Sequence, residues 1–129
     1  MDKENYKHTE LTEEIIQVFY KVYNSLGYGF LEKVYENAMA IELTKAGLHF
    51  AKQQPINVYY NNIQIGSYYA DIIVEDLVII ELKAAVGLCE EHEAQLTNYL
   101  RATEIEVGLL FNFGKTPQIK RKVFSNVYK

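Results

Sequence analysis

Residues 71–83 read DIIVEDLVIIELK, and this stretch does most to decide the fold. Two runs of mainly β-branched residues flank an acidic turn, a pattern typical of a β-hairpin. Asp71 opens the first run, and Glu81 and Lys83 close the second. Charged side chains cost free energy to bury unless they pair with one another or bind a metal. The stretch therefore predicts a charged cluster at the end of an otherwise apolar hairpin.

The length of the hairpin loop decides whether these three charges meet. Side chains alternate faces along a strand, so Glu81 and Lys83 share a face. A two-residue loop would turn Asp71 to the opposite face, whereas a three-residue loop would bring it to the side of Glu81. Asp76 can adopt the left-handed conformation that such a loop requires. We therefore expect a loop of odd length, with Asp71 and Glu81 pointing the same way.

If this condition holds, the two carboxylates and the carbonyl of Leu82 form a hard oxygen site suited to Mg²⁺ or Mn²⁺. A metal bound by Asp71, Glu81 and Leu82 would polarise a phosphate oxygen and lower the pKa of its water. The nearby carboxylates would keep Lys83 charged. We therefore expect Lys83 to position water and stabilise charge. A simpler alternative is that the three charged side chains form only a structural ion-pair network.

Apolar periodicity around this hairpin predicts the remaining elements. Helices are expected at residues 12–26, with Thr12 as N-cap, at 30–46 and at 88–102. Strands are expected at residues 48–53, 56–60, 63–66, 68–74, 77–83, 107–113 and 119–124, with a tight turn at Asn61-Asn62. This order predicts an α+β (α/β sandwich-like) domain in which helices flank a central mixed β-sheet. Strand 107–113 is apolar throughout, which suits an interior position.

Composition limits the classes of protein that fit. A chain of 129 residues with 49% hydrophobic content suits one domain with a single core. No apolar run approaches the about 20 residues that cross a bilayer, and residues 1–5 lack a signal-peptide core. The single cysteine, Cys89, excludes an internal disulfide and a zinc-finger cluster. We therefore expect a cytoplasmic protein without membrane contact.

The charge balance is acidic but uneven. A net charge of −4 argues against broad, non-specific nucleic-acid binding, which depends on phosphate neutralisation by Lys and Arg. No acid follows Glu106, and the segment after it carries Lys115, Lys120, Arg121, Lys122 and Lys129. This segment is either a local basic edge or a solvated strand and tail.

Two further motifs lie on the expected helices. Residues 29–35 read GFLEKVY, in which Glu32 and Tyr35 lie three apart and on one side of the helix. On the last helix, Gln95 and Tyr99 are four apart, and His92 shares their stripe. With residues 69–71 (YAD), 81–84 (ELKA) and 108–113 (GLLFNF), these blocks resemble the GxxExxY proteins, a branch of the PD-(D/E)XK nuclease superfamily. The resemblance runs from about residue 10 to residue 124.

The resemblance implies a PD-(D/E)XK nuclease-like (restriction-endonuclease-like) core as a single domain over residues 1–129. It implies that Asp71, Glu81 and Lys83 form the catalytic trio and that Glu32 is the acid from an early helix. Gln95 and Tyr99 match a pair that helps to position substrate or catalytic groups. Ala70 departs from the proline of the superfamily name but leaves the polar residues intact. The implied activity is Mg²⁺- or Mn²⁺-dependent hydrolysis of nucleic acid, with DNA favoured over RNA.

A second hypothesis is a non-catalytic module that binds nucleic acid or protein and retains the nuclease fold. The acidic charge and small size motivate it, because such a core would hold DNA weakly without a homodimer or a protein partner. The 11 Tyr and 6 Phe could form an interface, although ordinary core packing explains them equally well. Metal-binding calorimetry separates the two hypotheses.

Overall fold

The computed structural model describes residues 7–129, so the expected polar N-terminus at residues 1–5 lies outside the described residues. The elements in chain order are α1 (Thr9–Leu26), α2 (Glu32–Lys45), β1 (Phe50–Tyr60), β2 (Ile63–Val74), β3 (Val78–Lys83), α3 (Glu90–Arg101), β4 (Val107–Phe113) and β5 (Pro117–Val123). A short 3-10 helix, Asn126–Tyr128, follows them. Within the described residues, no helix is long and apolar enough to cross a membrane.

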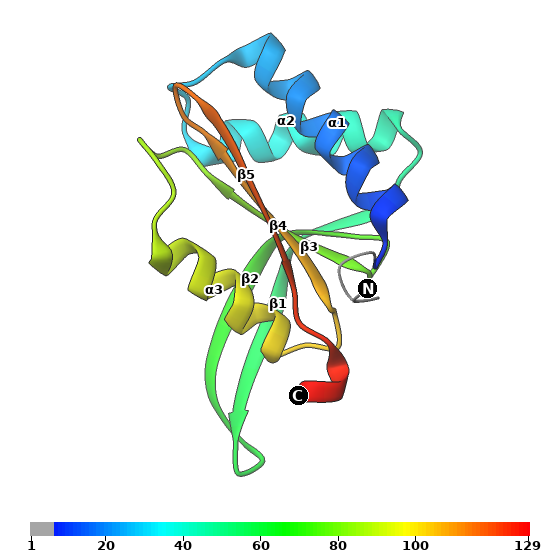
Figure 1. The fold of residues 1–129 in the computed structure, drawn as a ribbon, viewed down its shortest axis with the longest axis vertical. Helices are drawn as coiled ribbons and strands as arrows, with labels where there is room; N and C mark the ends of the chain where they lie inside the picture. Colours follow the sequence, from blue (N-terminus) through cyan, green and yellow to red (C-terminus); the bar gives the residue numbers. More distant parts are fainter. Residues whose placement is uncertain (1–6) are drawn as a thin grey trace, which may run out of the picture.

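The strands form one mixed five-stranded sheet in the order β1-β2-β3-β4-β5. Strands β3 and β4 are parallel, and the other neighbouring pairs are antiparallel. Helix α3 lies between the parallel strands in the chain and covers one face of the sheet, while α1 and α2 cover the other (Figure 1). This arrangement confirms the predicted α+β architecture with a central mixed sheet.

Alternation along β3 and β4 divides the core between the two faces. On the α1 and α2 side, the ring of Phe19 stacks on Phe111 with centroids 4.4 Å apart, and Tyr35 stacks on Phe113 at 4.0 Å. On the other side, Leu96 of α3 lies so close to β4 that a Cβ at Gly108 would come within 2.6 Å of it. Strand β4 is buried along its whole length, as expected for an interior strand.

The boundaries of α1 and of the first strands differ from the sequence expectation. Helix α1 begins at Thr9, so Thr12 is not its N-cap; the Thr12 hydroxyl instead donates to the carbonyl of Thr9 at 3.0 Å. The four short strands expected between residues 48 and 74 are two long ones, β1 and β2. Pro55 is tolerated inside β1 because β1 is an edge strand. On the open side of an edge strand no neighbouring strand accepts a backbone hydrogen bond, so the missing N–H costs little.

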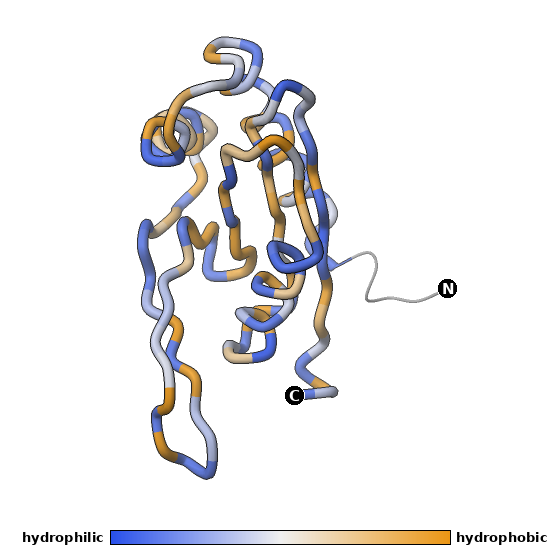
Figure 2. The backbone as a smooth tube through the Cα atoms, turned by 90° about the vertical axis from the view of Figure 1, so that its left-hand side faces the viewer, coloured by the Kyte–Doolittle hydropathy of each residue, from blue (hydrophilic) through white to orange (hydrophobic). Residues whose placement is uncertain are grey.

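The tight turn between β1 and β2 is confirmed at Asn61 and Asn62, which both have positive φ, 51° and 64°. Only Ile72–Val74 of β2 pairs with β3, so the rest of this hairpin extends past β3 as a two-stranded ribbon. We call residues 57–68 the β-arm; it projects from the body of the protein in both views (Figures 1 and 2). Most of its large apolar and aromatic side chains are exposed.

Candidate metal and active site

The hairpin loop between β2 and β3 brings the two carboxylates together. Val74 pairs with Val78, so the loop contains three residues, as predicted. Two of them, Glu75 and Asp76, adopt positive φ of 54° and 56°. Acidic side chains tolerate this left-handed conformation better than β-branched ones do. Because the register pairs Ile72 with Ile80, the next residues outward, Asp71 and Glu81, lie opposite each other on one face.

Side-chain hydrogen bonds replace the backbone ladder at this point. The main-chain N–H of Asp71 donates to Oε2 of Glu81 at 2.8 Å, and the N–H of Leu82 donates to Oδ2 of Asp71 at 2.8 Å. Each carboxylate is therefore fixed by a donor from the other strand. The second oxygen of Glu81 accepts no hydrogen bond within residues 7–129. The strands thus present two adjacent carboxylates with an oxygen available to a further ligand.

This placement makes both carboxyls reluctant to ionise. Burial, and then the charge of Asp71, raise the pKa of Glu81 to about 8. Burial also raises the pKa of Asp71, with a further contribution from Glu36. Glu81 is only 4% exposed, so water cannot offset the repulsion between the two charges. A divalent cation between them would relieve that repulsion.

A third carboxylate, Glu36 of α2, was missed in the sequence analysis. It is 3% exposed, and its Oε1 accepts a hydrogen bond from Nε2 of Gln53, which lies 3.5 Å from Oδ1 of Asp71. Lys33 Nζ lies 2.6 Å from Oε2 of Glu36, and Lys52 Nζ lies 3.7 Å from it. Burial alone would raise the pKa of Glu36, but the bonds from Lys33 and Gln53 outweigh it and lower that pKa.

Gln53 links this carboxylate to the metal-site hairpin through an unusual backbone. It is opposite Asp71 between two paired positions of β1 and β2, yet its φ is 51°. This left-handed residue interrupts the regular alternation of the strand. Its amide thereby reaches both Glu36 and Asp71. Neither the local sequence nor strand periodicity signals such a residue.

Glu32, the acid expected from the early helix, is exposed at the start of α2. It lines a small cavity of about 90 Å³ together with Glu36, Gln53, Asp71 and Leu82. Its charge is among the causes that raise the pKa of Glu81. The cavity therefore brings Glu32 to the carboxylate pair. The spacing of four residues places Glu32 and Glu36 on one side of the helix, but it does not distinguish the buried acid from the exposed one.

Tyr35 of the same motif has a structural role. Its buried hydroxyl donates to the carbonyl of Gly27 at 2.8 Å and accepts from the N–H of Phe30 at 3.2 Å. Gly29, with φ of 107°, allows the chain to turn between these two contacts. Tyr35 therefore anchors the loop that leads into α2 and places Glu32 at the cavity.

Lys83 ends β3 on the same face as Glu81 and is half-buried. Its charge opposes the rise in pKa of both Asp71 and Glu81. The loop that follows is held by the buried amide of Asn112, whose Oδ1 accepts from the N–H of Ala85 at 2.9 Å and whose Nδ2 donates to the Ala85 carbonyl at 3.0 Å. These bonds fix the chain just beyond Lys83.

On α3, Tyr99 faces the carboxylates, while Gln95 lies one turn away. Burial, and then the charges of Glu81 and Asp71, raise the pKa of Tyr99 to about 12, so its hydroxyl stays neutral. Gln95 lines the same groove as Tyr99 but makes no hydrogen bond to a carboxylate within residues 7–129. His92 is not part of the site: its Nδ1 accepts from the N–H of Cys89 at 3.3 Å at the start of the helix.

The two carboxylates of Asp71 and Glu81 fit Mg²⁺ better than they fit a metal whose ligands all come from the protein. Among the described residues, no group of three or more His, Cys, Asp and Glu side chains is arranged to hold an ion. Asp71 and Glu81 supply two carboxylates. Mg²⁺ characteristically binds through one or two carboxylates and keeps several waters. These residues are therefore consistent with such an ion.

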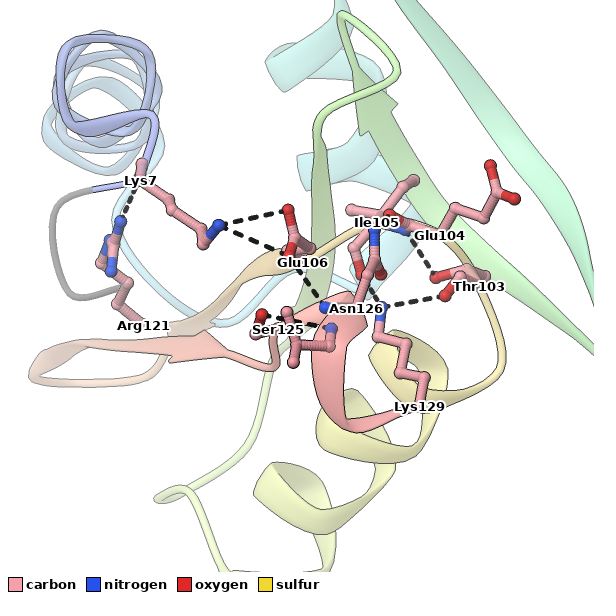
Figure 3. A network of polar contacts seen from close by, with 10 residues as sticks. Lys7, Thr103, Glu104, Ile105, Glu106, Arg121, Ser125, Asn126 and Lys129 are labelled. Carbon is pink, nitrogen blue, oxygen red and sulfur yellow. Dashed lines mark hydrogen bonds and ion pairs between the residues drawn. The ribbon is translucent and has the colours of Figure 1, made fainter. Parts of the chain in front are cut away.

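Three of the five cations that follow Glu106 have partners within the fold. Arg121 donates to the main-chain carbonyl of Lys7, and Lys122 Nζ lies 2.6 Å from a carboxylate oxygen of Glu93. Lys129 donates to two main-chain carbonyls between α3 and β4, at 2.8 and 2.9 Å (Figure 3). Arg121, Lys122 and Lys129 therefore contribute less to a basic edge, whereas Lys115 and Lys120 are exposed.

The family model of the PD-(D/E)XK nuclease superfamily matches residues 9–123. No match was found among curated proteins or among solved structures. The matched region includes all five strands and all three α-helices. The chain therefore belongs to the PD-(D/E)XK nuclease superfamily.

Proposed function

We propose that this protein is a Mg²⁺- or Mn²⁺-dependent nuclease of the GxxExxY branch that hydrolyses phosphodiester bonds. The observation that carries the proposal is the pair formed by Asp71 and Glu81. Each is bound to a backbone N–H at 2.8 Å, and burial raises the pKa of both. A buried pair of like charges is costly unless it has a ligand or a function.

The proposed roles follow from position. Asp71 and Glu81, with the carbonyl of Leu82, would hold the ion, which would supply a Lewis acid and lower the pKa of its water. Lys83 would position the attacking water and stabilise charge on the phosphate. Glu32, on the exposed side of the small cavity, adds an acid at the ion or the water.

The neighbouring side chains complete the proposed site. The neutral hydroxyl of Tyr99 can donate to a substrate oxygen, and Gln95 orients substrate along α3. Glu36 acts through Gln53 as a positioning residue for Asp71, since its own oxygens are occupied by Gln53 and Lys33.

Substitution of Glu81 tests the proposal. Glu81→Ala should abolish metal-dependent cleavage of labelled DNA and RNA substrates, because it removes one of the two carboxylates. Glu13→Ala is the matched control, since Glu13 is exposed on α1 and lies outside the site. Equal cleavage by Glu81→Ala and the parent protein would exclude this assignment.

The second candidate is a non-catalytic module that binds nucleic acid or a protein partner. The acidic net charge of −4 and the internal partners of Arg121 and Lys122 favour it, because both weaken the electrostatic attraction to a nucleic-acid backbone. Calorimetry separates the two candidates. Absence of Mg²⁺ or Mn²⁺ binding at millimolar concentration would favour the module.

A further inference from the structure

A broad concavity lies between the β-arm and α3. It has a volume of about 860 Å³. The β-arm contributes Asn57, Tyr59 and Tyr68, and α3 contributes Gln95, Tyr99 and Arg101. Tyr99 lines this groove, and the charges of Glu81 and Asp71 raise the pKa of its hydroxyl. The groove therefore shares one residue, Tyr99, with the surroundings of the proposed site.

Exposed aromatic rings dominate the arm side of this groove. Tyr59 is 60% exposed and Tyr68 is 48% exposed, so their rings are accessible to a ligand. The ring of Tyr68 lies 5.7 Å from that of Tyr99, at an interplanar angle of 46°. Tyr68 and Tyr99 thus form a ring pair within the groove, and Tyr59 lines the same groove. Exposed tyrosine rings can stack with nucleobases.

The charge of the groove argues against a duplex. Arg101 is the only cation among the described residues that line it, and the guanidinium lies over the ring of Phe124 at 5.0 Å. Glu91 contributes an opposing negative charge. Duplex binding depends on the neutralisation of several phosphates by Lys and Arg. A single strand also carries phosphates, but its unpaired bases can stack on aromatic rings, an interaction that is closed to paired bases.

We propose that this groove binds an unpaired stretch of nucleic acid, with bases stacked on Tyr59 and Tyr68 and the backbone led to Asp71 and Glu81. The side-chain amides of Asn57 and Gln95 are placed to hydrogen-bond to base edges. This inference rests on the proposed nuclease function and specifies its substrate as single-stranded. DNA and RNA share the unpaired bases that the groove recognises, so the experiment includes both.

Fluorescence anisotropy in EDTA measures binding without cleavage. The probes are labelled oligonucleotides of about 12 nucleotides, as single-stranded DNA, single-stranded RNA and duplex DNA, a length within the usual range of single-strand sites. We expect at least one single strand to bind about tenfold more tightly than the duplex. Tyr59→Leu and Tyr68→Leu should each weaken single-strand binding about tenfold, the effect of losing one base stack.

Two sets of controls keep the result specific. Tyr59→Phe and Tyr68→Phe retain the rings and should bind as the parent does. Tyr128→Leu alters a tyrosine that is 72% exposed but lies outside the groove, and it should also leave binding unchanged. Equal or tighter binding of the duplex would overturn the inference, as would unchanged binding by both Leu variants. Loss of self-association in those variants, with no oligonucleotide bound by the parent, would assign the arm to a protein interface and overturn it too.

Cleavage assays in Mg²⁺ keep this result separate from the proposed function. One outcome is cleavage of duplex and single strands at equal rates, abolished by Glu81→Ala but unaffected by Tyr68→Leu. It would support the nuclease function and refute the single-strand role of the groove. Ring-dependent binding of single strands without any cleavage would support the single-strand role of the groove and refute the nuclease function.

Discussion

Replacing Glu81 with glutamine should stabilise the metal-free protein at neutral and alkaline pH. The carboxyl has a pKa of about 8 in the folded protein and 4.5 as its ordinary value. Between these two values the unfolded chain releases a proton that the folded protein retains. Stability therefore falls as pH rises from about 4.5 to about 8, because the unfolded state binds fewer protons. Glutamine has no proton to lose and removes this dependence.

The size of the effect follows from the shift. The difference between 8 and 4.5 is about 3.5 units, and each unit corresponds to 1.36 kcal/mol, so the upper limit is about 5 kcal/mol. Asp71 shares the site, and water can enter when Glu81 ionises, so we expect about 2 to 3 kcal/mol. A typical domain has a total stability of about 5 to 15 kcal/mol, which makes a change of this size readily measurable.

Urea unfolding in EDTA, at intervals between pH 5 and pH 9, measures this effect. The Glu81→Gln curve should approach the parent curve at pH 5 and lie about 2 to 3 kcal/mol above it at pH 9. Glu13→Gln, on the exposed face of α1, should follow the parent throughout. Parallel curves for the parent and Glu81→Gln would refute the reasoning, since they would mean that the carboxyl ionises equally well in both states.

Three further predictions concern the ion and the framework of the site. The affinity for Mn²⁺, measured by calorimetry, should rise about tenfold per pH unit up to about pH 8, because the ion competes with the proton on Glu81; a flat profile would contradict this. Saturation with Mn²⁺ at 100 times its Kd should raise the free energy of unfolding by about 2.7 kcal/mol in the parent and by much less in Glu81→Gln, as measured by urea unfolding. Asn112→Ala should cost about 1 to 3 kcal/mol in the same assay, because the main chain of Ala85 loses both of its bonds to the amide; a change within 0.5 kcal/mol, the usual range for surface substitutions, would show that water replaces the amide.

The local chemistry of the hairpin explains why the carboxylate pair could be predicted. Strand alternation and a three-residue loop are sufficient to place Asp71 opposite Glu81, and both depend on residues within 71–83. Strand β4 was equally predictable, because an uninterrupted apolar run suits only an interior position. In these segments the short-range pattern and the final packing agree.

The continuity of β1 and β2 could not be predicted in the same way. Pro55 reads as the end of a strand, and only the position of β1 at the edge of the sheet makes it acceptable inside one. The start of α1 at Thr9 was missed because no side chain caps that end of the helix by a hydrogen bond. Tertiary position overrides the local signal in both cases.

The sequence by itself determined the α+β class, the interior strand and the facing carboxylates of Asp71 and Glu81. These features follow from periodicity and parity, which act over a few residues. Only the tertiary structure decided that Glu36 and Gln53 reach Asp71, and that the β-arm and α3 enclose a groove beside Tyr99. The burial of Glu36 and Gln53 cannot be predicted from the neighbouring sequence, because their partners come from elements distant in the chain.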